Sequence, residues 1–103
     1  GLPMFITENG LSRTDKVYRD GKVHDADRID FLARYLEKLS EGIHAGADVR
    51  GYFQWSLLDN FEWHSGYRER LGLVYVDYAT GQRIPKESAF WYGEVAATNG
   101  QSI

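Results

Sequence analysis

The residues best suited to chemistry lie in one stretch, VRGYFQWSLLDNFEW, at positions 49–63. Within it, the indoles of Trp55 and Trp63 bracket the carboxylate of Glu62. Flat indole faces can stack on the axial C–H groups of a sugar, and a carboxylate can accept hydrogen bonds from two neighbouring hydroxyls. The same composition is also typical of an aromatic-rich core strand that is followed by a polar turn. The stretch alone leaves both interpretations open.

A second candidate is Glu8, which ends the short apolar run GLPMFIT at positions 1–7. The run predicts a buried strand entered through Pro3, since proline is tolerated at the first position of a strand. Asn9-Gly10 then ends the strand in a turn. In parallel α/β folds, a carboxylate at the C-terminal tip of a buried strand is well placed for catalysis. The alternative is a strand-ending glutamate that points into water.

The elements that must position these residues begin with a polar stretch, 11–24, which predicts a surface loop with an Asp-Gly turn. Asp25 or Asp27 can then cap a helix that runs to about Ala45. Apolar residues recur there at steps of three and four, which indicates an amphipathic helix with one buried stripe. The stripe consists of Ile29, Leu32, Leu36, Leu39 and Ile43. The charged residues assigned to the opposite face are Arg28, Arg34, Glu37, Lys38 and Glu41.

A second buried strand begins at Val49, so that strand, helix and strand follow in a βαβ order. This order predicts parallel strands joined by a right-handed crossover. The long excursion 56–84 contains a short strand in LGLVYVDY, and the turn Ala79-Thr80-Gly81 pairs that strand with the residues that follow. Pro85 suits the first turn of a final helix at about 86–97.

Composition excludes several classes of function. The net charge of −3 gives no reason to expect a nucleic-acid or membrane-surface partner. Cysteine is absent and the three histidines are isolated, so no metal site is expected. No apolar run approaches a membrane span or a signal-peptide core, which makes the cytoplasm the default expectation for a compartment that the sequence otherwise leaves unknown.

The predicted architecture is α/β, but it holds only two parallel strands and two helices. Parallel strands are normally covered on both faces and flanked by further strands. Two strands alone leave open sheet edges and uncovered apolar surface. We therefore expect the chain to be part of a larger fold.

Long ordered motifs carry a resemblance to a known family. ITENG at 6–10, DADRIDFLARYL, GADVRGYFQWSLLDNFEWHSGY, LGLVYVDY and RIPKESAFWY resemble the C-terminal region of the family 1 glycoside hydrolases, the β-glucosidase family. The similarity extends from Leu2 to about Tyr92, in the same order and spacing. It implies a (β/α)8 TIM barrel, of which residues 1–103 supply the last two βα units, with strands 7 and 8, as the C-terminal segment of a single catalytic domain.

The resemblance also implies roles for four residues in a retaining hydrolase that needs no cofactor. Glu8 matches the nucleophile, and Trp55 matches the platform beneath the sugar. Glu62 matches the carboxylate that grips the outer hydroxyls, and Trp63 the indole whose N–H reaches a ring hydroxyl. An anion at Glu62 would repel a phosphate. The implied substrate is an unphosphorylated β-glucoside or oligosaccharide, with β-fucosides and β-galactosides as further candidates.

Two departures from the family pattern accompany the resemblance. Leu71 stands where the family usually has phenylalanine. The general acid/base glutamate, which the family carries on an earlier strand, does not occur in this chain. General acid catalysis typically contributes about 10²–10⁴-fold, so the isolated chain should be close to inactive without its N-terminal barrel segment as partner. The alternatives are a carbohydrate-binding remnant and a homo-oligomer that associates through its open sheet edges.

Overall fold

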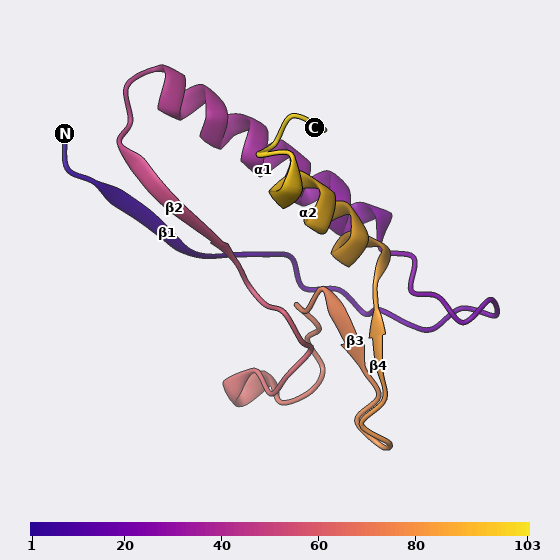
Figure 1. The fold of residues 1–103 in the computed structure, drawn as a ribbon. Helices are drawn as coiled ribbons and strands as arrows, with labels where there is room; N and C mark the ends of the chain where they lie inside the picture. The colour runs from indigo at the N-terminus through magenta and orange to yellow at the C-terminus, as the bar shows by residue number, and fades with distance from the viewer.

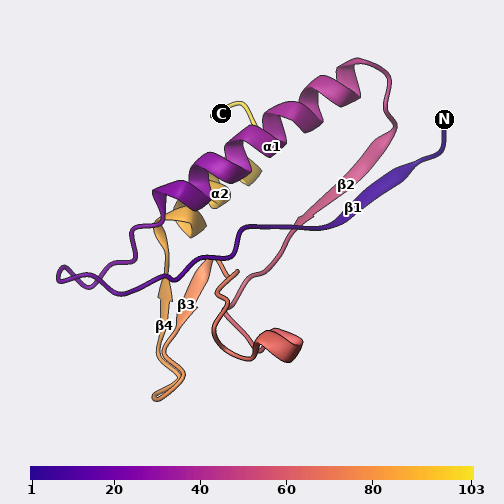
Figure 2. The same cartoon turned by 180° about the vertical axis from the view of Figure 1, so that it is seen from behind.

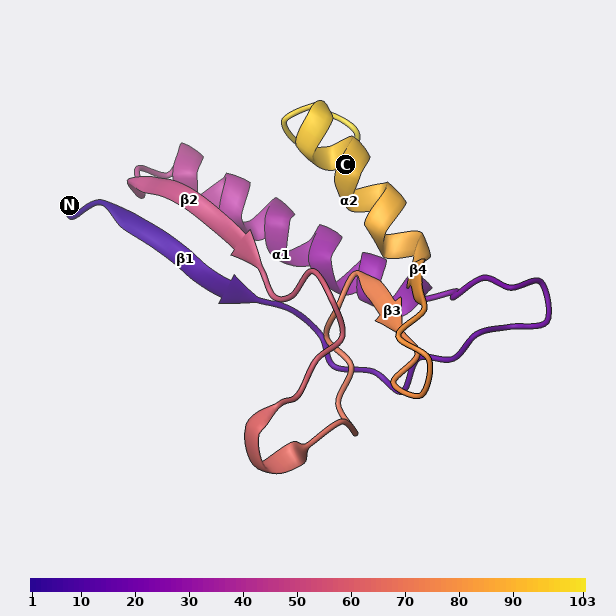
Figure 3. The same ribbon diagram turned by 60° about the horizontal axis from the view of Figure 1, so that its bottom comes forward.

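The computed structural model describes all 103 residues and forms an elongated molecule of 47 × 31 × 18 Å. In chain order its elements are β1 (Met4–Asn9), α1 (Ala26–His44), β2 (Val49–Gln54), the 3-10 helix η1 (Trp63–Ser65), β3 (Val74–Val76), β4 (Arg83–Pro85) and α2 (Glu87–Ala97). Figure 1 shows β1 and β2 side by side, the two helices together, and the β3–β4 hairpin at one end. Both helices lie on one side of the β1–β2 pair and η1 projects on the other (Figures 1 and 3).

The β1–α1–β2 unit is the predicted βαβ arrangement. β1 pairs in parallel with β2, with Ile6 opposite Tyr52 and Asn9 opposite Gln54. Because the strands are parallel, the residues that follow both strands leave from the same end of the sheet. This end carries the candidate site.

Helix α1 confirms the predicted span to within about one residue at either end, but two face assignments were wrong. Arg28 is fully buried, although it was assigned to the solvent face, whereas Ile43 of the apolar stripe is 44% exposed. Arg28 lies four residues before Leu32 and so shares its face. Asp25 occupies the N-cap position, but its carboxylate makes no capping hydrogen bond to α1.

The β3–β4 hairpin confirms the predicted pairing across the turn. Gly81 adopts a φ of +80°, which favours glycine, and β3 pairs antiparallel with β4. The prediction for Pro85 was wrong, because this residue ends β4 opposite Val74 and does not start the helix. Lys86 is the N-cap residue of α2.

The expectation of two buried strands was also wrong for this chain. Phe5 and Phe53 are each 58% exposed, and they lie together beside Gly51. The expected uncovered apolar surface is therefore present on the β1–β2 pair. The buried hydrophobic residues are Val23, Leu32, Leu73 and Val95.

The segment 11–24 is more than a surface loop. Figure 2 shows it passing the β3–β4 hairpin on its way to α1. Arg13 forms an isolated bridge with Arg70, and the carbonyl of Val23 accepts a hydrogen bond from the backbone N–H of Glu87. Val23 is 1% exposed. Neither helix has both the length and the apolar character that crossing a membrane requires.

Candidate functional site

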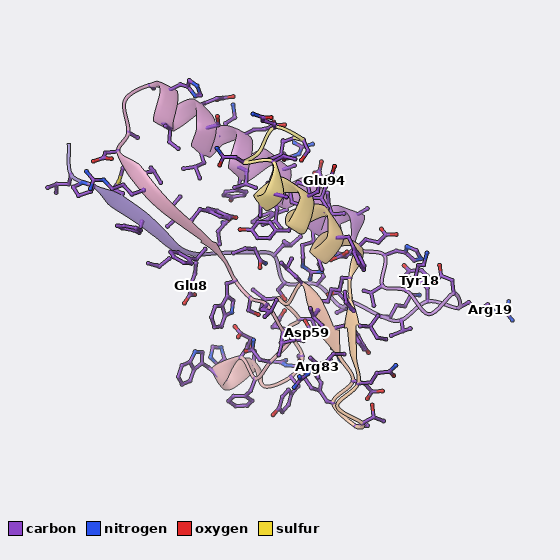
Figure 4. The ribbon with its side chains drawn as sticks, viewed as in Figure 1. Glu8, Tyr18, Arg19, Asp59, Arg83 and Glu94 are labelled. Carbon is purple, nitrogen blue, oxygen red and sulfur yellow. The ribbon has the colours of Figure 1, made fainter.

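Glu8 and Trp55 lie at neighbouring strand ends. Glu8 is the penultimate residue of β1, and its exposed side chain points away from the two helices (Figure 4). Trp55 directly follows β2, and its backbone N–H donates a hydrogen bond of 2.8 Å to the carbonyl of Asn9. The structure thus brings a free carboxylate and a partly exposed indole to the same end of the sheet.

Two further contacts fix this end. A Cβ on Gly10 would stand 2.0 Å from the carbonyl oxygen of Trp55, so only glycine permits the segments that follow β1 and β2 to approach this closely. The Tyr52 hydroxyl donates a hydrogen bond of 2.8 Å to Oδ1 of Asn9, the neighbour of Glu8. Burial, with a smaller contribution from Tyr92, raises the pKa of Tyr52 to about 12, so the hydroxyl keeps its proton.

Glu62 and Trp63 lie farther along, in the β2–β3 loop (residues 55–73). Glu62 is half-buried and precedes η1, and its backbone N–H donates a hydrogen bond of 2.8 Å to the carbonyl of Gly66. Trp63 is 83% exposed and adopts a φ of +46°, which is uncommon for a non-glycine residue.

The β2–β3 loop is closed at its base by hydrogen bonds between its two ends. The backbone N–H of Ser56 donates to the carbonyl of Leu71, and the N–H of Leu73 donates to the carbonyl of Ser56. Asp59 reinforces this closure, since its Oδ1 accepts a hydrogen bond of 3.0 Å from the backbone N–H of Gly72. The loop that carries Glu62 therefore leaves the sheet through a fixed base.

Buried charges lie behind this base, and we call them the polar cluster. Its members are Asp15, Asp25, Arg28, Asp59, Arg70 and Lys86. Every buried side-chain nitrogen and oxygen of the chain has a hydrogen-bond partner. Burial raises the pKa of Asp15, but hydrogen bonds from Arg28 and Lys86 outweigh it, so this pKa lies below its usual value. Figure 4 places Asp59 between η1 and the hairpin.

The polar cluster escaped the sequence analysis. One signal was available, because Arg28 stands at helical spacing from Leu32 and three residues after Asp25, which it contacts at 2.6 Å. No local signal marks Lys86 and Asp59, which are 27 residues apart in the chain and 2.8 Å apart in space.

The strand ends form an open surface in this chain. A cavity lies elsewhere, between α1 and α2, and none of the four candidate residues lines it. No group of three or more histidine, cysteine, aspartate or glutamate side chains is arranged to hold a metal ion.

Comparison with known proteins decides the family. The sequence profile of Glycosyl hydrolase family 1 matches residues 1–101. The chain belongs to this family. Among its family 1 relatives, β-glucosidase A of Thermotoga maritima is 50% identical over 97 residues, which are 94% of this chain and 22% of that protein. A bifunctional β-D-glucosidase/β-D-fucosidase of Bifidobacterium breve is 54% identical over 96 residues, 89% of this chain and 21% of that protein.

The solved structures agree with the sequence relatives. The family 1 β-glucosidase from T. maritima superposes with a TM-score of 0.94 at 50% identity, over 95% of this chain and 22% of that one. The same enzyme in complex with deoxynojirimycin gives a TM-score of 0.92 at 51% identity, over 93% and 22%. This family 1 chain thus spans about 22% of the length of these relatives and has the structure of part of a TIM-barrel glycosidase.

Proposed function

We propose that this chain supplies the seventh and eighth βα units, the C-terminal segment, of a retaining β-glucosidase that removes terminal β-D-glucosyl residues. The observation that carries the proposal is the position of Glu8. It lies at the C-terminal end of a parallel strand, beside Trp55, in a chain about 50% identical to β-glucosidases. Active sites of (β/α)8 barrels are built at these strand ends.

In the proposed reaction Glu8 is the nucleophile. Its carboxylate oxygen attacks the anomeric carbon while the bond from that carbon to the aglycone oxygen breaks, which gives a covalent glycosyl-enzyme ester. The aglycone oxygen takes a proton from an acid that lies outside this chain. The same outside group, now a base, removes a proton from water, and the resulting attack on the anomeric carbon releases the sugar and frees Glu8.

Trp55, Glu62 and Trp63 hold the sugar in this proposal. The partly exposed indole of Trp55 is the stacking surface, and Glu62 accepts hydrogen bonds from the outer hydroxyls while Trp63 donates one through its indole N–H. A carboxylate at Glu62 disfavours 6-phosphorylated sugars. The names of the relatives, a β-glucosidase and a glucosidase/fucosidase, support an unphosphorylated β-glucoside or β-fucoside as substrate.

The test uses a chimera in which residues 1–103 replace the matching segment of T. maritima β-glucosidase A. The chimera should hydrolyse aryl β-glucosides, and Glu8→Gln should lower kcat by more than about 10³-fold, because it removes the nucleophile from an otherwise unchanged site. Glu94→Gln is the matched control, since Glu94 is an exposed residue of α2 remote from Glu8 (Figure 4). Its activity should equal that of the unmodified chimera.

A folded chimera that binds glucose without turnover would favour the carbohydrate-binding alternative. Hydrolysis that survives Glu8→Gln would remove Glu8 from the role of nucleophile. Either result overturns the proposal, provided that circular dichroism shows the chimera to be folded.

A further inference from the structure

One buried cation joins the two loops that leave the site end of the sheet. The ammonium of Lys86 is fully buried, and it donates hydrogen bonds of 2.7 Å to Oδ2 of Asp15 and 2.8 Å to Oδ1 of Asp59. Asp15 lies in the loop that follows Glu8, and Asp59 lies in the β2–β3 loop, three residues before Glu62. Lys86 alone contacts both carboxylates.

Two arginines bind the same carboxylates. Arg28 binds both oxygens of Asp15, at 3.1 and 2.8 Å, and Arg70 binds Oδ2 of Asp59 at 2.7 Å. Arg28 also donates a hydrogen bond of 2.9 Å to the carbonyl of Arg70. Because each carboxylate has a second cation, loss of Lys86 leaves both carboxylates with a partner and removes the link between them. The backbone N–H of Arg13 and the guanidinium of Arg28 still donate to the carbonyl of Arg70.

We propose that Lys86 is a positioning residue that sets the distance between Glu62 and the nucleophile Glu8. The inference rests on the proposed function, because it takes the roles of Glu8 and Glu62 from there. Lys86 does not reach the strand ends itself and acts only through Asp15 and Asp59.

The link is stiff enough for this role. Both the ammonium and the Asp59 carboxylate are excluded from water, so their attraction is screened little. Asp59 also holds the N–H of Gly72 at the far end of the β2–β3 loop, where a Cβ would come within 2.3 Å of the backbone of Asp59. A shift of Asp59 therefore moves the whole base of the loop, and a misplacement of about 1 Å can cost about 10²-fold in rate.

The expected effect depends on the substrate, because Glu62 contacts the outer hydroxyls only. In the chimera, Lys86→Met should lower kcat/KM about 10- to 100-fold for an aryl β-glucoside, equivalent to one charge-assisted hydrogen bond. For the matching aryl β-xyloside, which lacks the outer hydroxymethyl group, we expect a loss of less than about 5-fold. Lys38→Met, at an exposed lysine of α1, is the matched control and should change neither value.

A purely structural role would lower both values alike, so an equal loss on the two substrates overturns the inference, as does no loss at all. Should Lys86→Met fail to fold, Lys86→Gln decides the question, because this neutral and shorter side chain weakens the link between Asp15 and Asp59 and leaves each carboxylate its arginine. The same dependence on the hydroxymethyl group is expected for it. The proposed function is judged separately by Glu8→Gln, which must abolish hydrolysis of both substrates.

Discussion

The polar cluster and the β1–β2 sheet differ in how completely this chain builds them. In the polar cluster, carboxylates and cations from both loops, α1 and the α2 N-cap satisfy one another, and no buried polar side-chain atom lacks a partner. In the sheet, the face carrying Phe5 and Phe53 has nothing packed over it. The chain thus contains its own support for the site loops, whereas the hydrophobic core of the strands must come from further barrel strands.

The largest effect is expected in the polar cluster. Lys86→Met should destabilise the chimera by about 3–5 kcal/mol, because it leaves two buried carboxylates short of one cation. Urea unfolding of the chimera measures the change. Lys38→Met removes an exposed pair with Glu41 and should have no measurable effect. Equal changes in the free energy of unfolding for the two substitutions would show that the polar cluster does not stabilise the loops of the site.

A substitution in the sheet should change a different property in the chimera and in the isolated chain. Phe53→Ala should destabilise the chimera by about 3 kcal/mol or more, since a complete barrel would bury this ring. In the isolated chain, where the ring is 58% exposed, the same change should reduce self-association in sedimentation. A chimera that loses no stability would show that this face stays uncovered in the complete enzyme.

Gly10 connects the two regions, and its replacement should have an intermediate effect. Gly10→Ala places a methyl group against the carbonyl of Trp55 and should cost about 1–3 kcal/mol, with loss of activity because the tips of β1 and β2 separate. Gly42→Ala in α1 meets no atom within 4 Å and should stabilise the chimera by about 0.5–1 kcal/mol. The melting temperatures of the two variants compare these effects. Stability changes of the same sign in both variants would contradict the close approach of Gly10 to the carbonyl of Trp55.

The smallest effect concerns pH. Hydrogen bonds to Asp20 and then to Glu87 raise the pKa of His24 above its usual value of 6.5. The stabilisation by this histidine is therefore complete below about pH 6.5 and is lost as pH rises through the folded-state pKa. An NMR titration of the imidazole should give a pKa above 6.5, and Glu87→Gln should lower it. An unchanged pKa in Glu87→Gln would exclude the contact with α2.

Sequence reasoning located elements with local signals and missed contacts between distant segments. The span of α1 and the hairpin follow from periodicity and from a glycine turn, both readable within a few residues. Lys86 and Asp15 are 71 residues apart, and nothing near either of them marks it as buried. Pro85 was misplaced because proline suits both a helix start and an edge strand.

The candidate site also combines features that have a local sequence signal with features that depend on distant contacts. Glu8 became a candidate through its position after an apolar run, with a solvent-facing glutamate as the alternative, and the structure places it at a strand end beside Trp55. The roles of Glu8, Trp55, Glu62 and Trp63 came from family resemblance and stay predictions. Their placement depends on the fixed base of the β2–β3 loop, which no pattern in the sequence indicates.

The most direct test of the central claim is to trap the glycosyl-enzyme. The chimera is incubated with an aryl 2-deoxy-2-fluoro-β-glucoside, whose ester intermediate turns over slowly, and is then digested and analysed by peptide mass spectrometry. We expect one sugar adduct, located on Glu8. A sugar adduct on another carboxylate, or an active chimera that forms no adduct, would contradict it.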